Sequence, residues 1–431
     1  MSKRIALATI GTQGDVQPFV ALALRLKASG YSVVLGTSEN FQGFVESYAL
    51  DFVSLGKDMQ AFLTQDAFSG RVVSPRALAN ARTLWRDAQA LIEAATRAAW
   101  PMAQDADALV LNMNTSFGLD FAEALGIPAI FVAPQPLTAT REFPLVVFGT
   151  PTLGRPLNRM TYRIMELQQW FYNLPRNRLR AELMQLPARR NGAFFRATDG
   201  APVPVLYCYS PLVSPAPADW PATSVVTGFF RLEDRSDWAP TPELRAFLAA
   251  GEPPIYIGFG SMPFGAERNT QIMARAMELW GGRAVVSRGW GGIDPSRLPG
   301  SVFPLLERAP HDKLFPLMGA VVHHGGAGTT AAGLTAGRPS MAVPQTVDQP
   351  FWGARIHALG CGPVPIPLRS MTPEKLAAAL RDLSTNLGYA EKAAALGVAL
   401  RAEDGTGRAV TEIERIMARA PRKSPALVSV P

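Results

Sequence analysis

The sequence predicts an α/β protein made of two doubly wound parallel sheets, each covered by helices. The chain has 431 residues, about three times the length of a typical domain of about 150 residues. Short apolar runs alternate with helical segments in both halves of the chain, an order typical of parallel sheets. A polar, proline-rich stretch at 230–254 separates the two halves. We therefore expect an N-terminal domain at 1–225, a linker at 226–254, a C-terminal domain at 255–421 and a disordered tail at 422–431.

The elements of the first domain follow from apolar runs that stop at glycine, proline or polar residues. The first run ends at Gly11, so we expect a buried strand that enters a loop, followed by a helix. The predicted strands are 4–10, 31–37, 51–55, 106–112, 127–133 and 203–209. The predicted helices are 18–28, 39–48 and 116–125.

The same alternation restarts after the linker and predicts the second sheet. The predicted strands are 255–259, 284–287, 301–305, 320–323 and 340–343, with helices at 269–279 and from about 328.

Residues 136–200 interrupt the alternation of the first domain. Apolar residues recur there at spacings of three and four, which predicts an amphipathic helix that ends at Pro175. They are Leu157, Met160, Ile164, Leu167, Phe171 and Leu174. Aromatic residues and arginines are dense in the same segment. One interpretation is a wall for a lipophilic substrate with a basic rim near a membrane surface, and the other is an ordinary core stripe with a solvated opposite face.

Composition excludes several classes of protein. Hydrophobic residues make up 48% and charged residues 18%, a balance that favours a packed globular chain over disorder. The net charge of +7 comes without a long Lys/Arg block, so nucleic acid is not expected as a partner. Cys208 and Cys361 lie far apart and predict neither a disulfide framework nor a zinc site, which fits the cytoplasm. The sequence shows no secretion signal and no membrane-spanning run.

The segment 321–334 (VVHHGGAGTTAAGL) carries the clearest chemistry. An apolar strand runs into glycines and hydroxyl residues, and a helix follows. Glycines let a ligand approach the backbone, and the free N–H groups at a helix start attract phosphate. We therefore expect an anion site here, with a structural tight turn as the alternative. Neither the dinucleotide fingerprint nor the P-loop pattern is present.

Three further motifs carry a family resemblance. Residues 308–315 (RAPHDKLF), 323–333 and 344–353 (PQTVDQPFWG) resemble the donor-binding region of nucleotide-sugar glycosyltransferases of the sterol glucosyltransferase type. Residues 11–20 (GTQGDVQPFV) resemble the opening motif of that family, which usually has Arg where this chain has Gln13. The resemblance extends to bacterial transferases that glycosylate antibiotics, polyketides and glycolipids.

This resemblance implies the GT-B architecture, in which two Rossmann-like domains face each other across a cleft. The first domain would bind the acceptor, with 136–200 as an acceptor-wall insert, and the second the nucleotide sugar. The diphosphate would be held by the side chain or backbone of His324, Gly326, Gly328 and Thr329, and Ser261 would support it from a neighbouring loop. No metal or other cofactor is implied, since backbone donors and a helix dipole balance the charge of the diphosphate.

The remaining donor contacts are also implied by the resemblance. Asp348 and Gln349 match the acidic-amide pair that grips the sugar hydroxyls, and their chemistry suits a polyol; a solvated turn is the alternative. Ala309 lies where the family contacts the base of the nucleotide through backbone atoms. Trp290 offers a stacking face for that base, although ordinary packing would also explain it.

The proton acceptor is expected to be Asp15. All four histidines, His311, His323, His324 and His357, lie in the second half, so the N-terminal histidine base of many plant-type relatives is absent. We expect Gln17 to cap a helix that starts at Pro18, which leaves the Asp15 carboxylate outside the helix as general base.

Asp120 and Glu123 are the alternative carboxylates, should Asp15 prove to be structural.

The predicted function is inverting transfer of a hexose from a UDP- or dTDP-sugar to a hydroxyl of a lipophilic acceptor, such as a sterol, glycolipid, polyketide or phenol. Two alternatives are a nucleotide-sugar 2-epimerase and a catalytically inactive sugar-nucleotide-binding partner protein. The enzyme is expected in the cytoplasm, with peripheral contact to the inner membrane face as a further expectation.

Overall fold

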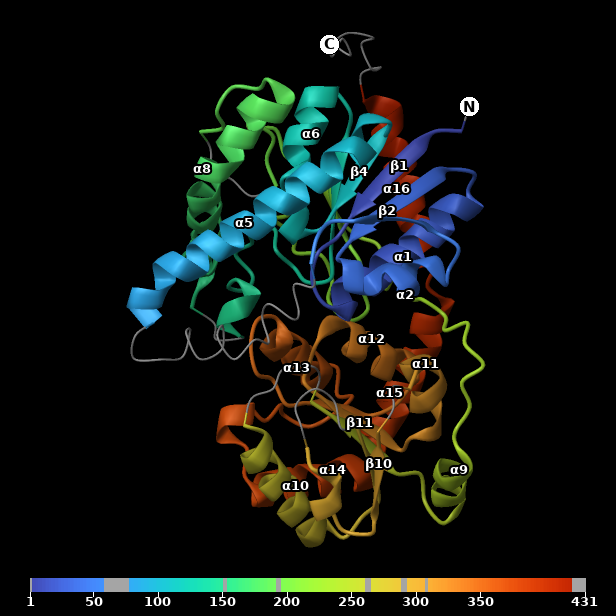
Figure 1. Cartoon of the computed structure of the whole chain (residues 1–431). Helices are drawn as coiled ribbons and strands as arrows, with labels where there is room; N and C mark the ends of the chain where they lie inside the picture. The colour runs from blue at the N-terminus through green and yellow to red at the C-terminus, as the bar shows by residue number, and fades with distance from the viewer. Residues whose placement is uncertain are drawn as a thin grey trace.

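Two parallel sheets with helices packed against them confirm the predicted fold class (Figure 1). The computed structural model describes residues 2–57, 77–149, 153–190, 195–259, 265–287, 293–306 and 309–420. The first sheet has the strand order β3-β2-β1-β4-β5-β6-β7 and the second the order β10-β9-β8-β11-β12. Every neighbouring pair of strands is parallel.

The strands agree closely with those expected from the apolar runs. They are β1 (Arg4–Ala8), β2 (Ser32–Thr37), β3 (Asp51–Ser54), β4 (Ala108–Leu111), β5 (Ala129–Ala133), β6 (Val205–Tyr207), β7 (Ser224–Val226), β8 (Ile255–Gly258), β9 (Ala284–Ser287), β10 (Val302–Leu305), β11 (Ala320–His323) and β12 (Ser340–Ala342). The three-residue strand β7 was not expected, because its apolar run is too short to stand out from the surrounding loop.

The helices lie on both faces of each sheet. In the first half they are α1 (Gln13–Ala28), α2 (Gln42–Glu46), α5 (Ala77–Gln104), α6 (Gly118–Leu125), α7 (Arg155–Thr161), α8 (Arg163–Met184) and α9 (Pro242–Ala249). In the second half they are α10 (Ala266–Trp280), α11 (His311–Leu314), α12 (Ala327–Thr335), α13 (Gln349–Ala358), α14 (Pro373–Thr385), α15 (Leu387–Ala402) and α16 (Gly405–Arg419).

Successive side chains of each strand point to opposite faces of the sheet, so one strand feeds two cores. In β1, Ile5 and Leu7 are buried in the cluster that α1 covers, whereas Ala6 and Ala8 belong to the cluster on the other face. This burial on both faces explains why the strands read as continuous apolar runs rather than as alternating patterns.

The predicted end of the amphipathic helix in 136–200 is wrong. Pro175 lies inside α8, which continues to Met184 and ends at Gln185 in the left-handed conformation (φ 56°). The 28-residue helix α5 was not predicted either. It lies against α8 and α6 on the flank of the N-terminal domain (Figure 1).

Helix α16, the last helix of the predicted C-terminal domain at 255–421, packs on the N-terminal domain instead. Helix α16 packs against α1, and its residues Val410 and Ile413 are buried in the N-terminal core (Figure 1). Within residues 2–420 as the structure describes them, the chain crosses between the domains after β7 and again between α15 and α16.

The two crossings touch at a pair of glycines. A Cβ added to Gly228 (φ 110°) would lie 2.9 Å from the Cα of Gly405, and one added to Gly405 would lie 2.5 Å from the carbonyl oxygen of Phe229. Only glycine allows two backbones to approach this closely. Beside the crossing, the Ser210 hydroxyl donates to Oε1 of Glu403 (2.9 Å).

Within the described residues, none of the helices combines the length and the apolar character that crossing a bilayer requires.

Candidate active site

Asp15 lies in the first turn of α1, not ahead of the helix as predicted. Helix α1 begins at Gln13 with Thr12 as its N-cap, and it continues through Pro18. The Thr12 backbone N–H (2.8 Å) and hydroxyl (3.1 Å) both donate to Oδ2 of Asp15. A carboxylate at the third helical position that reaches back to the N-cap is the acidic half of a capping box. This local signal, three residues after Thr12, outweighs the proline on which the sequence prediction relied.

Gly11 makes room for this carboxylate. Its φ is 153°, and an added Cβ would lie 2.2 Å from Oδ2 of Asp15. Any side chain at position 11 would therefore displace the Asp15 carboxylate. Nothing in the sequence around Gly11 indicates this close contact.

The loop that carries Gly11 is fixed from the neighbouring strand. β1 and β4 are adjacent and parallel, so their carboxyl ends meet at the same edge of the sheet. The side-chain amides of Asn112 (2.9 Å) and Asn114 (2.8 Å) both donate to the carbonyl oxygen of Ile10. These two positioning residues were missed, because nothing in the sequence indicates that residues 10 and 112 are neighbours.

The environment of Asp15 suits a proton acceptor. Burial raises the pKa of this carboxyl, and the hydrogen bonds from Thr12 only partly oppose the rise. A higher pKa makes the carboxylate a stronger base. Both hydrogen bonds go to Oδ2, and within the described residues Oδ1 has no recorded partner.

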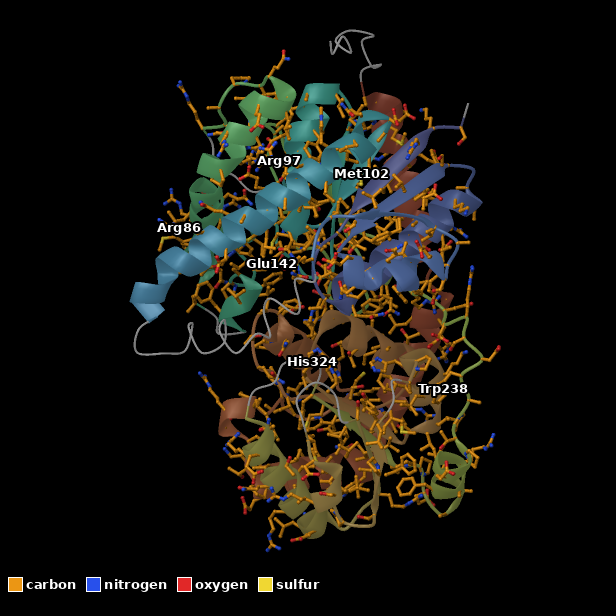
Figure 2. All side chains as sticks on the ribbon, in the orientation of Figure 1. Arg86, Arg97, Met102, Glu142, Trp238 and His324 are labelled. Atoms are coloured by element: carbon orange, nitrogen blue, oxygen red, sulfur yellow. The ribbon has the colours of Figure 1, made fainter. Side chains whose placement is uncertain are left out.

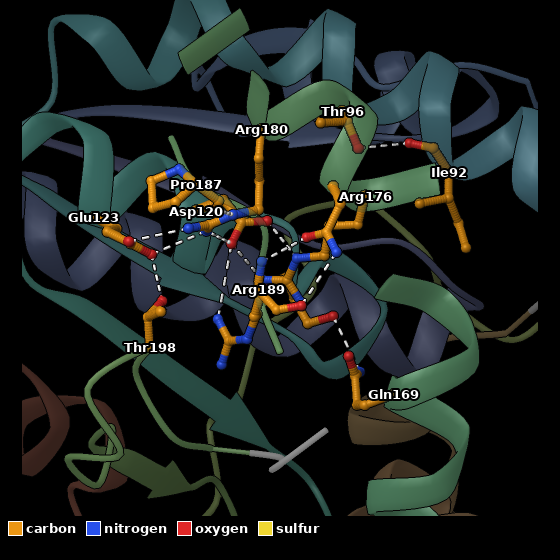
Figure 3. A network of polar contacts seen from close by, with 12 residues as sticks. Ile92, Thr96, Asp120, Glu123, Gln169, Arg176, Arg180, Pro187, Arg189 and Thr198 are labelled. Carbon is orange, nitrogen blue, oxygen red and sulfur yellow. Dashed lines mark hydrogen bonds and ion pairs between the residues drawn. The ribbon is translucent and has the colours of Figure 1, made fainter. Parts of the chain in front are cut away.

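The alternative carboxylates are engaged elsewhere (Figure 3). Asp120 is only 1% exposed and pairs with Arg176 and Arg180, and Arg180 also binds both oxygens of Glu123 (2.9 and 3.0 Å). Each oxygen of these two carboxylates is held by a guanidinium group, so neither side chain presents a free oxygen to an acceptor hydroxyl. The structure therefore removes Asp120 and Glu123 from the list of candidate bases.

The glycine-rich turn lies between β11 and α12, as predicted. Gly326 is the N-cap of α12, so Gly328 and Thr329 lie in its first turn, where backbone N–H groups have no intrahelical partner. His323 is fully buried, and its Nδ1 accepts the N–H of Gly325 (2.9 Å). This bond holds the turn, so His323 is a packing residue at the end of a strand.

His324 lies over this turn, at the end of the C-terminal domain that faces the N-terminal domain (Figure 2). A Cβ added to Gly326 would lie 2.5 Å from Nε2 of His324, so the imidazole and the start of α12 form one surface. Burial lowers the pKa of His324 to about 4. The ring is therefore neutral at pH 7 and can donate one hydrogen bond.

Asp348 and Gln349 lie directly beside the turn, because a Cβ added to Gly325 would lie 2.8 Å from the carbonyl oxygen of Gln349. Asp348 is the N-cap of α13, and its Oδ2 accepts the indole N–H of Trp352 (2.8 Å). Val347, just before it, has a φ of 56°, which is strained for a β-branched residue. Backbone strain of this kind concentrates at functional sites.

The two members of the acidic-amide pair are placed differently. Gln349 is 8% exposed, and its Oε1 accepts the backbone N–H groups of Gln345 (2.7 Å) and Thr346 (3.2 Å). Its carbonyl group therefore shapes the loop that presents Asp348. Burial raises the pKa of Asp348 to about 6.

Asp15 and Asp348 belong to different domains but lie within electrostatic reach of each other. The negative charge of Asp15 contributes to the raised pKa of Asp348. Helix α13 makes this approach possible, because Phe351 packs on Phe143 (centroids 5.4 Å apart) and Arg355 donates to the carbonyl oxygen of Val213 (2.8 Å). Sequence spacing offers no signal for this pairing.

The structure describes only some of the residues that are expected to contact the base of the nucleotide. Ala309 is buried just before α11, in the cluster that also contains Tyr256 and Phe315. His311 stacks on Phe315 with ring centroids 4.3 Å apart. Ser261 and Trp290 lie outside the described residues. Among the described residues, no group of three or more His, Cys, Asp or Glu is arranged to hold a metal ion.

Two protein-family models match separate parts of the chain. Residues 5–144 match the Glycosyltransferase family 28 N-terminal domain, and residues 291–416 match the Erythromycin biosynthesis protein CIII-like, C-terminal domain.

Relatives of known function align over nearly the whole chain. The sterol 3-beta-glucosyltransferase UGT80A2 of Arabidopsis thaliana is 36% identical over 94% of this chain and 64% of its own length. The O-mycaminosyltylonolide 6-deoxyallosyltransferase of Streptomyces fradiae is 35% identical over 95% of this chain and 97% of its own length. The chain thus spans less than two thirds of the plant relative but nearly all of the bacterial one.

Solved structures share the fold. The glycotransferase of kitacinnamycin superposes with a TM-score of 0.68 at 19% identity, over 97% of this chain and all of that one. The glycosyltransferase VinC, solved in complex with DTDP, superposes with a TM-score of 0.65 at 19% identity, over 96% of this chain and all of that one. Both likenesses support the two-domain GT-B arrangement.

Proposed function

The chain belongs to the glycosyltransferase family that contains the sterol 3-beta-glucosyltransferases and the O-mycaminosyltylonolide 6-deoxyallosyltransferase of Streptomyces fradiae, and we propose that it moves a hexose from a UDP- or dTDP-sugar to a hydroxyl of a lipophilic acceptor. One observation carries the proposal most directly. Helix α13 packs on the N-terminal domain through Phe351 and Phe143, and its N-cap Asp348 lies beside the glycine-rich turn of His324, close enough to Asp15 for the two charges to interact. This arrangement supports a reaction in which Asp15 accepts the proton, Asp348 binds the hexose and the start of α12 binds the diphosphate.

The C-terminal domain binds the donor in this proposal. The N–H groups at the start of α12 and the imidazole of His324 hold the diphosphate, and Asp348 accepts hydrogen bonds from hydroxyls of the hexose. Because these donors balance the charge of the departing diphosphate, the proposed reaction needs no bound metal.

Replacing His324 by alanine is expected to weaken binding of UDP or dTDP by about 10- to 150-fold. The reason is that one hydrogen bond to a charged group contributes about 1.5–3 kcal/mol. Isothermal titration calorimetry with the free nucleotide measures the effect. His357→Ala serves as the matched control, since His357 is exposed on α13 and bonds only the carbonyl oxygen of Gly362 among the described residues. Unchanged affinity in His324→Ala would contradict the assignment.

Asp15 is the general base in this proposal. The acceptor oxygen attacks the anomeric carbon as its proton passes to the carboxylate, and the bond from that carbon to the diphosphate oxygen breaks. Attack on the face opposite the leaving group inverts the anomeric configuration. The acid limb of the pH profile should therefore report the raised pKa of Asp15.

Thr12→Val is expected to move this acid limb to higher pH. The variant removes one hydrogen bond to the charged form of Asp15, so the pKa of the carboxyl rises further. As the pH falls, the carboxyl takes up its proton earlier and turnover is lost sooner, whereas turnover at alkaline pH stays near that of the wild type. Thr12→Ser keeps the hydroxyl and is the control. A limb that stays in place, or moves to lower pH, would count against Asp15 as the titrating group.

Product analysis separates this function from its two alternatives. Transfer produces a glycoside with inverted anomeric configuration, which nuclear magnetic resonance identifies. A 2-epimerase would change the sugar nucleotide without any acceptor, and an inactive partner protein would bind donor without turnover. The proposal would be overturned if the donor were epimerised. It would also be overturned if the donor bound tightly but gave no product with any acceptor in a panel of sterols, polyketides and phenols. Residence in the cytoplasm stays a prediction.

A further inference from the structure

An apolar stripe on α7 and α8 faces away from the domain that carries it. Leu157, Met160, Ile164 and Leu167 recur at spacings of three and four, yet each is at least 50% exposed. The nearby Val147, Phe148 and Leu153 are also more than 40% exposed. We call these seven residues the α7–α8 face. Clustered exposed apolar side chains of this kind mark interaction surfaces.

Core packing does not account for this stripe, because the opposite side of the same helices already packs on the domain. Asn158, Tyr162, Met165 and Gln169 follow helical spacing and are all less than 10% exposed. Residues 162 and 164 lie about 200° apart around the helix axis, since each residue turns it by about 100°. The interpretation of the stripe as an ordinary core stripe is therefore wrong for its four described members.

The segment around the α7–α8 face has an excess of arginines over acidic residues, although three of these arginines are buried in ion pairs with Asp120. Residues 136–200 contain ten arginines and four acidic residues, a net charge of +6, whereas the whole chain has +7. Arg155 and Arg163 are exposed on the same helices. Helix α8 lies on the outer flank of the N-terminal domain, beside α5 (Figure 1).

We propose that the α7–α8 face binds an anionic lipid bilayer, with its apolar side chains inserted at the interface and the arginines against lipid phosphates. Apolar residues beside cationic ones match the two layers of such a surface. A second copy of this chain fits less well, because it would bring its own exposed Arg155 and Arg163 close to those of the first copy. The inference rests on the proposed function only in that a lipophilic acceptor is held in such a bilayer.

Co-sedimentation with sucrose-loaded vesicles tests the proposal. The chain should bind vesicles of phosphatidylglycerol and phosphatidylcholine more tightly than vesicles of phosphatidylcholine alone, and binding should weaken as salt rises. The variant Ile164→Gln/Leu167→Gln removes apolar area without changing charge, so binding should fall about tenfold or more. The variant Arg155→Gln/Arg163→Gln should lose about fivefold per arginine.

The matched control is Leu387→Gln/Val398→Gln in the C-terminal domain. These residues are 74% and 64% exposed, so the control removes similar exposed apolar area from a different surface and should bind vesicles like the wild type. The proposal would be overturned if the control lost as much vesicle binding as Ile164→Gln/Leu167→Gln, or if Ile164→Gln/Leu167→Gln bound vesicles like the wild type. The proposal would also be overturned if light scattering showed that the wild-type chain is a dimer without lipid and that Ile164→Gln/Leu167→Gln dissociates this dimer.

The assay contains no sugar nucleotide and no acceptor. Failure of vesicle binding is therefore distinct from failure of sugar transfer, which the product assay reads separately.

Discussion

Replacing Asp15 by asparagine is expected to lower kcat by about 10²–10⁴-fold, the usual contribution of general-base assistance. The substitution removes the charge that accepts the acceptor proton, while the amide oxygen can still accept the hydrogen bonds that Thr12 donates. The start of α1 should therefore survive, and affinity for free nucleotide should stay close to that of the wild type. Turnover under saturating donor and acceptor, with thermal unfolding to verify the fold, measures the effect.

Gly11→Ala provides an independent check on the same carboxylate. Its new Cβ would lie only 2.2 Å from Oδ2 of Asp15, so the side chain must move although its charge remains. Turnover should fall in this variant as well. Gly30→Ala is the control, because Gly30 also has positive φ (90°) but a Cβ there meets no atom within 4 Å. A folded Asp15→Asn variant with near-normal turnover would show that Asp15 is a helix cap and no more.

Asp348→Ala is expected to weaken binding of the sugar donor by about 10²–10⁴-fold and to leave binding of free UDP or dTDP within about twofold. The variant removes up to two hydrogen bonds between a carboxylate and sugar hydroxyls, each contributing about 1.5–3 kcal/mol. Calorimetry with the nucleotide and with the sugar nucleotide separates the two effects. Asp348→Asn keeps an acceptor for the indole of Trp352, so it isolates the loss of charge from the loss of loop structure.

The pH dependence of donor binding provides a second readout for Asp348. Its pKa is raised to about 6, and the ionised carboxylate is the form that accepts from two hydroxyls. Affinity for the sugar donor should therefore fall as the pH drops through about 6, beyond any change seen for nucleotide alone. In Asp15→Asn a neighbouring negative charge is gone, so this midpoint should move to lower pH. Equal losses for nucleotide and sugar donor in Asp348→Ala would contradict the assignment.

Gln349 was expected to act in the same way as Asp348, and that role stays a prediction. Its Oε1 holds the backbone of Gln345 and Thr346, so Gln349→Ala should also loosen the loop. Comparing it with Asp348→Asn distinguishes contact with the sugar from support of the loop.

Local sequence signals determined much of the protein. The strands follow from apolar runs that end at glycine or polar residues, because burial on both faces of a parallel sheet demands such runs. The glycine-rich turn between β11 and the start of α12 follows from the glycines and hydroxyls after β11. Competing local signals caused the errors: the capping signal from Thr12 to Asp15 outweighed the one at Pro18, and α8 accommodated Pro175 in its interior.

Only the tertiary structure decided which residues meet and which way each surface faces. Periodicity shows that residues 157–167 have an apolar side. The stripe faces outward because Tyr162 and Met165, on the opposite side of the helices, are buried against the domain. Contacts between distant parts of the chain return α16 to the N-terminal domain and bring Asp15 near Asp348. Such contacts also pair Asp120 with buried arginines, which excludes it as a candidate base. Such contacts form because folding buries apolar area between elements, and a linear pattern records which faces are apolar but not which faces become partners.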